Sequence, residues 1–246
     1  MKAGLIGYPL KNGFSKAWFT KRFENLNMKD SSYENYALER IEEFDLLCKN
    51  HPELNGLSVT IPHKQAIIPY LDSLSPEAEA IGAVNCIHFT NGQKLGHNTD
   101  AIGFKTSLLE WLGDYKPESA LVLGIGGAAK AIIHVLNQEN IRVTKVGLHA
   151  NPSTPKKAYT DLTEIDYREH QLIVNCSPLG MHPNPDGLVP LNYELITENH
   201  WCYDLIYNPD QTRFLEESAK RGAKIKNGLQ MLHLQAEAAF SIWNSK

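Results

Sequence analysis

Two residues of opposite charge stand where they could move a proton together. Lys64 comes shortly after the apolar run 57–61, and Asp100 stands just before a predicted helix over 102–111. An ammonium group held by a carboxylate can donate or accept a proton, which is general acid–base chemistry. Each residue also has a simpler interpretation, Lys64 as a solvated surface lysine and Asp100 as a helix N-cap. Both alternatives stay open at this stage.

The segment 121–136 reads LVLGIGGAAKAIIHVL and has the spacing of a phosphate-binding turn. Its first three residues form an apolar run, typical of a strand buried on both faces. Gly124, Gly126 and Ala129 then fit the pattern G-x-G-x-x-[GA] ahead of a helical stretch. The first glycine makes the turn, the second lets a pyrophosphate approach the backbone, and the helix start faces the anion. This context favours a dinucleotide site over a turn that binds nothing.

Two amide side chains are further candidates for a ligand site. Asn85 lies in the segment IGAVNCI, and Gln235 lies on the flank of the apolar stripe of the last predicted helix. Polar groups at strand ends lie where open α/β sheets bind ligands. The alternatives are a turn asparagine for Asn85 and a glutamine bonded to backbone for Gln235.

Composition limits the class of protein. The chain has 246 residues, a net charge of −4, 42% hydrophobic and 21% charged residues, which is ordinary for a globular protein of one or two domains. The acidic balance argues against a nucleic-acid partner, and no apolar run approaches the ~20 residues that span a membrane. The start MKAGLIGYPL is interpreted as a strand. The four scattered cysteines predict free thiols in a reducing cytoplasm and no metal site.

Short strands and helices alternate along the chain, which predicts an α/β fold with two domains. Strands are expected at 3–6, 33–37, 56–60, 84–88, 93–96, 172–174, 201–205 and 223–226, and 121–148 is expected to form one βαβ unit. Helices are expected at 17–25, 39–49, 65–70, 76–80, 102–111, 212–221 and from 228 onward. We expect one domain over 1–101 with 228–246, and a Rossmann-like dinucleotide-binding domain over 102–227. The helix 102–111 and the last helix are the natural crossings.

The motifs, in this order, resemble the shikimate dehydrogenase family over nearly the whole chain. They are GYPL…FSK at 7–16, GLSVTIPHK at 56–64, IGAVN at 81–85, GHNTDAIGF at 96–104, VLGIGGAAKA at 122–131, NCSPLGM at 175–181, DLIYNPDQT at 204–212 and NGLQMLHLQAEAAF at 227–240. The resemblance implies a cytoplasmic oxidoreductase that interconverts 3-dehydroshikimate and shikimate in chorismate and aromatic amino acid biosynthesis. It also implies that the first domain binds substrate and carries the catalytic residues.

The resemblance implies a role for each matching residue. Lys64 would be the acid–base residue and Asp100 its partner. Ser15, Thr60, Asn85 and Gln235 would hold the substrate's carboxylate and hydroxyls, Gly124, Gly126, Gly127 and Ala128 would cradle the cofactor pyrophosphate, and Tyr207 and Gly228 would lie where nicotinamide meets substrate. The expected partners are small molecules, with no nucleic acid and no membrane, for a monomer or homodimer.

The chain departs from the family pattern on the substrate side. The first motif usually has two serines that grip a carboxylate, and here Gly13 takes the place of one while Ser15 is kept. A lost hydrogen bond to a charged group costs roughly 1.5–3 kcal/mol, about ten- to a hundredfold in affinity. Ser58 also replaces the usual asparagine. Quinate or a related polyol carboxylate is therefore an alternative substrate.

The cofactor side departs as well. No arginine for the 2′-phosphate of NADP appears in the segment 148–151, and no carboxylate for the ribose of NAD. Donors and positive charge for a phosphate could come from His149, Asn151, Ser153, Thr154, Lys156 and Lys157, although a solvated loop is the simpler interpretation of the two lysines. NADP is expected from the family, with NAD possible. An alternative of another class is a relative that binds ligands without turnover, against which the retained Lys64 and Asp100 argue.

Overall fold

The computed structural model describes residues 1–10, 13–150 and 156–245. This part of the chain forms two compact units, Met1–Ile102 with Gln235–Lys246, and Gly103–Leu234. The chain passes to the second unit within α4 (Thr99–Leu112) and returns within α8 (Leu229–Trp243), the two crossings that the sequence indicates. The first unit resumes at Gln235, inside α8, whereas the sequence suggested a boundary at residue 228, where the helix was expected to begin. The sequence of a continuous helix does not show which of its halves packs on which unit.

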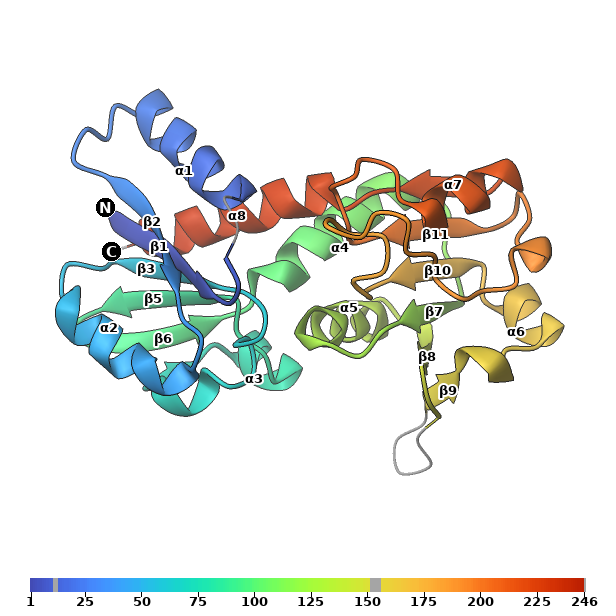
Figure 1. Cartoon of the computed structure of the whole chain (residues 1–246), viewed down its shortest axis with the longest axis horizontal. Coiled ribbons are helices and arrows are strands. Elements are labelled where there is room, and N and C mark those ends of the chain that lie inside the picture. The colour runs from blue at the N-terminus through green and yellow to red at the C-terminus, as the bar shows by residue number, and fades with distance from the viewer. Residues whose placement is uncertain (11–12, 151–155, 246) are drawn as a thin grey trace. The chain divides into compact units, whose positions relative to one another are not determined.

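The first unit is built on a mixed six-stranded sheet in the order β2-β1-β3-β5-β6-β4 (Figure 1). The strands are β1 (Lys2–Gly7), β2 (Ser32–Ala37), β3 (Gly56–Val59), β4 (Ser73–Leu74), β5 (Cys86–Thr90) and β6 (Gln93–His97). The strands β2, β1 and β3 are parallel, so their carboxyl ends meet at one edge. β5 and β6 form the antiparallel hairpin that Asn91-Gly92 predicts.

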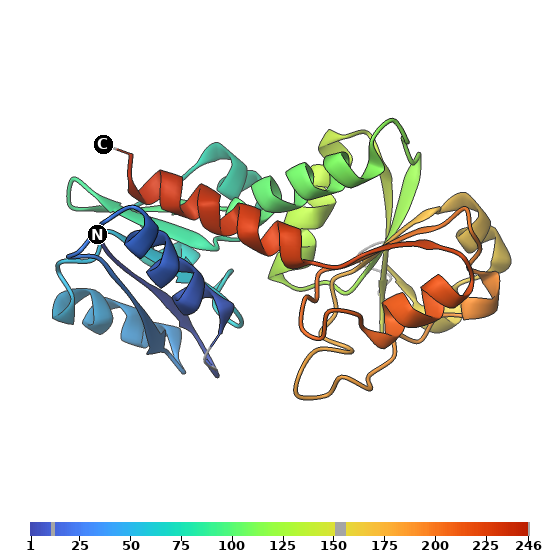
Figure 2. The same ribbon diagram turned by 90° about the horizontal axis from the view of Figure 1, so that it is seen from above.

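Helices cover both faces of this sheet. On one face α1 (Phe14–Asn25) and α8 lie side by side, and Phe19, Tyr33 and Trp243 meet there in an aromatic cluster (Figures 1 and 2). On the other face pack α2 (Phe44–Asn50) and η2 (Ile68–Tyr70), with Phe44 and Ile67 buried against the strands. α3 (Pro76–Ile81) precedes β5.

Some local predictions for this unit were wrong. The helix expected over 65–70 is a series of turns that ends in the single 3₁₀ turn η2. Pro69 explains this, because proline has no N–H and fits only the first turn of a helix. The helix expected from residue 39 begins as the 3₁₀ turn η1 (Ile41–Glu43), and the strand expected from residue 84 begins at Cys86.

The second unit has a parallel sheet in the order β12-β11-β10-β7-β8-β9. Its strands are β7 (Ser119–Leu123), β8 (Arg142–Gly147), β9 (Lys156–Ala158), β10 (Leu172–Asn175), β11 (Trp201–Asp204) and β12 (Lys224–Lys226). Numbered from β7, this is the strand order 3-2-1-4-5-6 of the doubly wound dinucleotide-binding fold. The order reverses between β7 and β10, where such sheets bind ligands. The predicted Rossmann-like fold is therefore confirmed.

Helices also cover both faces of the second sheet. The helices are α5 (Gly127–Gln138), α6 (Glu164–Glu169) and α7 (Arg213–Lys220), with the 3₁₀ turns η3 (Tyr159–Asp161) and η4 (Tyr193–Leu195). Tyr167 of α6 and Phe214 of α7 pack on one face, and Phe104 and Trp111 of α4 contact Tyr203 of β11. The sequence did not predict β9 and α6, because both elements are short and consist mostly of polar residues.

Two general findings concern the described residues. None of their helices is long and apolar enough to cross a membrane, and no group of three or more metal-ligating side chains gathers among them. The four cysteines are free thiols, as the sequence predicts.

Candidate active site

Lys64 and Asp100 form an ion pair in the first unit. The Lys64 Nζ lies 2.5 Å from the Asp100 Oδ2, and the two side chains are 15% and 10% exposed. Partial burial matters here, because an ion pair screened from water keeps its geometry and strength. The expected approach of these two side chains is observed. Their exposure leaves room for a ligand to contact the pair.

Asn85 holds the carboxylate from its other side, and Thr99 in turn holds Asn85. Asn85 is buried, and its Nδ2 donates to Asp100 Oδ1 at 2.9 Å and to Thr99 Oγ1 at 2.9 Å. Its Oδ1 accepts from the Thr99 backbone N–H at 2.6 Å. Asp100 therefore has one oxygen on the ammonium of Lys64 and the other on an amide. This network fixes the direction in which Asp100 orients the lysine.

The N-cap of α4 is Asn98 rather than Asp100. The Asn98 Oδ1 accepts from the Ala101 backbone N–H at 3.2 Å, and its Nδ2 donates to the Ala83 carbonyl at 2.9 Å. Because Asn98 satisfies the helix end, the carboxylate of Asp100 is free to face Lys64. The interpretation of Asp100 as the N-cap is therefore wrong. The sequence N-T-D could not show which residue caps the helix, because asparagine, threonine and aspartate all occur as N-caps.

The turn that carries Lys64 is fixed by its neighbours. The Lys64 backbone carbonyl accepts from the Val84 N–H at 2.7 Å, which places the lysine next to Asn85. Its neighbour His63 is buried and contacts the Leu38 carbonyl through Nε2 at 2.6 Å. The sequence alone could not indicate this role for His63, since a histidine bonded to a distant backbone carbonyl leaves no local pattern.

The other predicted substrate residues also belong to the first unit. Thr60 follows β3 and donates its backbone N–H to the Ile6 carbonyl at 2.9 Å. Gln235 accepts from Thr99 Oγ1 at 3.4 Å, so it reaches the Asn85–Asp100 network through that hydroxyl. Ser15 lies in the first turn of α1, directly after Phe14, and Gly13 is the N-cap of that helix.

The glycine turn of the second unit has the geometry of a phosphate cradle. Gly124 has a φ of +101°, and a Cβ there would lie 3.1 Å from the backbone of Cys176 and Ser177. Gly126 is the N-cap of α5 and makes no side-chain cap, and a Cβ there would meet nothing within 4 Å of the described atoms. A compact turn with open space at its second glycine fits a pyrophosphate. Gly127 and Ala128 form the first turn of α5.

Tyr207 and Gly228 belong to the second unit. Gly228 precedes α8 and packs so closely on Leu205 that a Cβ would overlap its carbonyl. Tyr207 is half-buried, and burial raises the pKa of its phenol. The glycine thus lets α8 begin directly beside the loop that carries Tyr207.

Buried Asp204 fixes the loop that carries Tyr207. Its carboxylate accepts from Thr212 Oγ1 at 2.6 Å, from Asn175 Nδ2 at 3.0 Å and from the Ile206 N–H at 3.0 Å. Burial raises the pKa of Asp204 to about 6, because these neutral donors offset only part of the lost hydration.

Lys156, the first residue of β9, lies over the end of β8, after which the family often has an arginine. A Cβ on Gly147, the last residue of β8, would lie 3.4 Å from the Lys156 Nζ, so this ammonium lies over the strand end. Lys157 instead pairs with Asp166 at 2.5 Å. Lys157 lies in a strand rather than a loop and pairs with a buried carboxylate, while its own side chain stays 43% exposed. The candidates Asn151, Ser153 and Thr154, like Asn12 of the first motif, lie outside the described residues.

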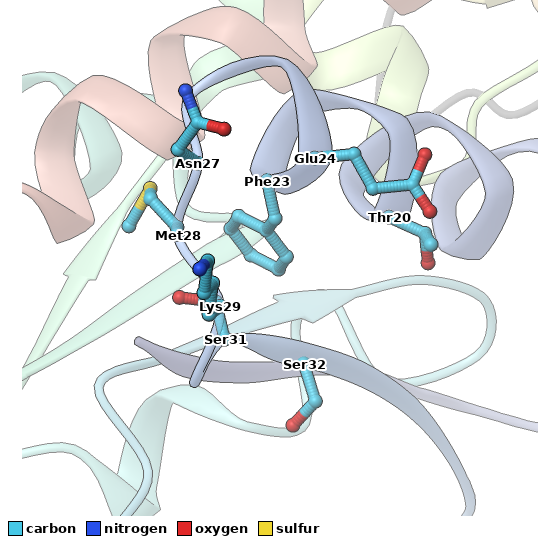
Figure 3. Close-up of a pocket in the computed structure, with 8 residues that line it drawn as sticks. All are labelled: Thr20, Phe23, Glu24, Asn27, Met28, Lys29, Ser31 and Ser32. Carbon is cyan, nitrogen blue, oxygen red and sulfur yellow. The ribbon is translucent and has the colours of Figure 1, made fainter.

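A hollow of about 380 Å³ in the first unit lies away from these residues. It is lined by Thr20, Phe23, Glu24, Asn27, Met28, Lys29, Ser31 and Ser32 (Figure 3). Ser32 begins β2, whereas Lys64 follows the carboxyl end of the parallel strand β3. The hollow thus opens at the opposite edge of the sheet from the ion pair and contributes nothing to the proton-transfer site.

The chain thus combines a doubly wound unit with a glycine turn and a second α/β unit that carries a lysine–carboxylate pair. Residues 5–87 match the family model described as the shikimate dehydrogenase substrate binding domain. The chain is 34% identical to the shikimate dehydrogenase (NADP(+)) of Caldanaerobacter subterraneus subsp. tengcongensis, covering 99% of this chain and 91% of that protein. It is 35% identical to that of Methanosphaera stadtmanae, with the same coverage. The chain belongs to the shikimate dehydrogenase family.

Solved structures agree with this assignment. The shikimate 5-dehydrogenase of Thermus thermophilus, in complex with NADP(H) and shikimate, has a TM-score of 0.85 and 31% identity, covering 99% of this chain and 93% of that one. The Listeria monocytogenes enzyme, in complex with shikimate and NAD, has a TM-score of 0.86 and 26% identity, covering 100% and 92%.

Proposed function

We propose that this protein catalyses the reversible, NADP-dependent reduction of 3-dehydroshikimate to shikimate. The observation that carries the proposal is the largely buried ion pair of Lys64 and Asp100, which buried Asn85 holds in place. Family membership supplies the substrate class, since the full-length relatives carry that activity in their names. The product places the protein in chorismate and aromatic amino acid biosynthesis.

The chemistry of the pair follows from its geometry. NADPH supplies the hydride when it is bound. Turning a ring ketone into a secondary alcohol also requires a proton on the oxygen, and the Lys64 ammonium can donate it at hydrogen-bond distance. Asp100 keeps the Lys64 side chain oriented for this step. In the oxidising direction Lys64 accepts the hydroxyl proton, and the same contacts hold the lysine in place.

The residues of the second unit fit a dinucleotide. The backbone of Gly124, Gly126, Gly127 and Ala128 would hold the pyrophosphate at the start of α5. Lys156, over the end of β8, would face the 2′-phosphate that distinguishes NADP from NAD. A single lysine is a weaker and less directional grip than an arginine. We therefore expect NADP to be preferred and NAD to be accepted.

Each of the two units then has its own function. We assign substrate binding and catalysis to the unit formed by residues 1–102 and 235–246, and nucleotide binding to residues 103–234. Ser15, Thr60 and Gln235 would contact the substrate beside Lys64, and Tyr207 and Gly228 would contribute from the second unit. We further expect a cytoplasmic monomer or homodimer with no nucleic-acid or membrane partner. Light scattering after gel filtration measures the oligomeric state.

A spectrophotometric assay tests the function. The purified protein is mixed with shikimate or quinate, each with NADP or NAD, and the absorbance of the reduced nicotinamide is followed. Shikimate with NADP is expected to give the highest kcat/KM. Higher kcat/KM with quinate would reassign the substrate, and the absence of turnover with all four pairs, in a protein that still binds NADP, would favour the non-catalytic alternative.

A further inference from the structure

Asp204, the last residue of β11, is a fully buried carboxylate. Within the described part of the chain, it accepts hydrogen bonds only from neutral groups. Burying a carboxylate with neutral partners alone costs free energy, and an apolar side chain of similar size would avoid that cost. The carboxylate is therefore expected to matter for the geometry that it imposes on its neighbours.

Asp204 fixes the turn after β10 through Asn175. Asn175 is the last residue of β10 and is also fully buried. Its Nδ2 donates to Asp204 Oδ1 at 3.0 Å, and its Oδ1 accepts from the Ser177 N–H at 3.0 Å and from Ser177 Oγ at 2.7 Å. Because an ionised carboxylate can only accept, it decides that the carbonyl end of the amide faces Ser177. Asp204 thus sets the direction of the turn 175–177.

This turn packs directly against the glycine turn of the same unit. The Cys176 N–H donates to the Leu123 carbonyl at 2.8 Å, and a Cβ on Gly124 would lie 3.1 Å from the Ser177 nitrogen. Two turns in such close contact cannot shift independently. The contact also lies between β7 and β10, where the strand order reverses and doubly wound sheets bind their ligands.

The same carboxylate fixes the loop after β11. β10 and β11 are parallel neighbours (Figure 1), so the segments that follow them leave the same edge of the sheet. Asp204 Oδ1 accepts from the Ile206 N–H at 3.0 Å, which fixes the backbone directly before Tyr207. The Ile206 carbonyl in turn accepts from the Gly228 N–H at 3.0 Å, at the start of α8. The oxygen that orients Asn175 therefore also fixes the segment that carries Tyr207.

The second carboxylate oxygen has a different task. Asp204 Oδ2 accepts from Thr212 Oγ1 at 2.6 Å, and Thr212 is the N-cap of α7. This bond seats a helix start instead of a turn at the switch point. The two oxygens thus separate the contacts that lead to the candidate nucleotide site from the contact that stabilises α7.

We propose that Asp204 is a positioning residue for the nucleotide, which holds the turn 175–177 and the Tyr207 loop at a fixed spacing through Asn175 and Ile206. With no exposed surface, Asp204 itself cannot touch a ligand. The assignment rests on the proposed function, which places the pyrophosphate at the glycine turn and Tyr207 where nicotinamide meets substrate. The two ends of one cofactor then depend on a single buried side chain.

Asp204→Ala is the direct test, because it removes the acceptor and leaves room for water at the freed donors. The Kd for NADP should rise about ten- to a hundredfold, the range for one lost hydrogen bond to a charged group. The kcat should fall as well, because the Tyr207 loop loses the same anchor. Asp204→Asn keeps an oxygen for Asn175 and Ile206, so its Kd for NADP should stay within about threefold of wild type.

Thr212→Val is the matched control for stability. It removes a hydrogen bond from the same carboxylate and weakens the N-cap of α7, but it leaves both contacts of Oδ1 in place. Its urea midpoint should fall, while its Kd for NADP should stay within about threefold of wild type. A role of Asp204 in stability alone would instead weaken NADP binding equally in Thr212→Val and Asp204→Ala.

Asn175→Ala keeps the proposal testable if Asp204→Ala does not fold. It breaks only the link to the turn 175–177, since Asp204 keeps Ile206 and Thr212, and it should weaken NADP binding as Asp204→Ala does. Wild-type affinity for NADP in either alanine variant would overturn the proposal. Calorimetry measures this binding without turnover, so a wild-type protein that binds NADP but does not oxidise shikimate would contradict the proposed function and not the role of Asp204.

Discussion

The two units build their candidate sites from different material. In the first unit the working groups are side chains from separate segments, with Lys64 after β3 and Asp100 on α4. In the second unit the pyrophosphate cradle is the backbone of a single turn from Gly124 to the start of α5. A side-chain site changes with single substitutions, as Gly13 and Ser58 illustrate. A site made of backbone tolerates substitutions of the surrounding side chains, but it is lost when a new side chain fills the space of the ligand.

The largest expected effect is on the side-chain site. Lys64→Met should lower kcat by about 10²–10⁴, because general acid–base catalysis is worth that much. Asp100→Asn should also lower kcat, and the double variant should lose little more, because the two residues act as a unit. Steady-state kinetics measures each loss, and calorimetry with shikimate checks that Lys64→Met still binds. Near-normal turnover without Lys64 would remove the pair from the mechanism.

At the backbone site, an added side chain that fills the space of the phosphates should be enough to weaken NADP binding. Gly126→Val should weaken NADP binding by about a hundredfold or more, some 3 kcal/mol, since its side chain would fill the volume of the phosphates. Gly126→Ala is the matched variant with a smaller side chain and should fall between Gly126→Val and wild type. Shikimate binding in the first unit should not change in either. Calorimetric titration with NADP measures the affinities, and a valine variant with wild-type affinity would show that the pyrophosphate lies elsewhere.

A smaller effect is expected where the nucleotide unit uses a side chain. Lys156→Gln should raise the KM for NADP about tenfold, the value of one lysine–phosphate contact, and leave the KM for NAD unchanged. Lys157→Gln is the control, since that lysine is paired with Asp166. The preference of wild type for NADP over NAD should stay below about a thousandfold, or 4 kcal/mol. A larger ratio, or equal effects of both variants, would point to a different phosphate site.

The smallest effect concerns pH and contrasts two buried carboxylates. Asp100 faces an ammonium, whereas Asp204 has only neutral donors and a pKa raised to about 6. A raised folded-state pKa means that the stability from Asp204 is present below about pH 4 and is lost as the pH rises through 6. Between pH 5 and 7 the free energy of unfolding of wild type should therefore fall by about 1 kcal/mol relative to Asp204→Asn.

Urea unfolding of both proteins at the two pH values measures this difference. NMR titration of the Asp204 carboxyl gives its pKa directly. Asp166, whose pKa is lowered because hydrogen bonds from Lys157 and Thr163 outweigh its burial, is the internal contrast. An Asp204 pKa near 4 would show that its three hydrogen bonds compensate fully for burial.

The sequence by itself determined the parts that local patterns encode. The run at 121–123, the spacing of Gly124 and Gly126 and the following helix predicted the nucleotide cradle, because backbone conformation depends on neighbouring residues. The ordered motifs also indicated Lys64 and Asp100 as partners. The helix expected over 65–70 failed at the same local level, where Pro69 outweighed the apolar spacing.

Only the tertiary structure decided which distant side chains meet. Asn98 proved to be the cap that leaves Asp100 available, Lys156 proved to lie over Gly147, and the Tyr33 hydroxyl proved to lie beside Ser15 and Ser58. None of these contacts leaves a local pattern, because each joins residues whose approach is fixed by packing and strand register. A tyrosine in a strand reads as core, and whether its hydroxyl is paired depends on residues that only the folded chain brings to it.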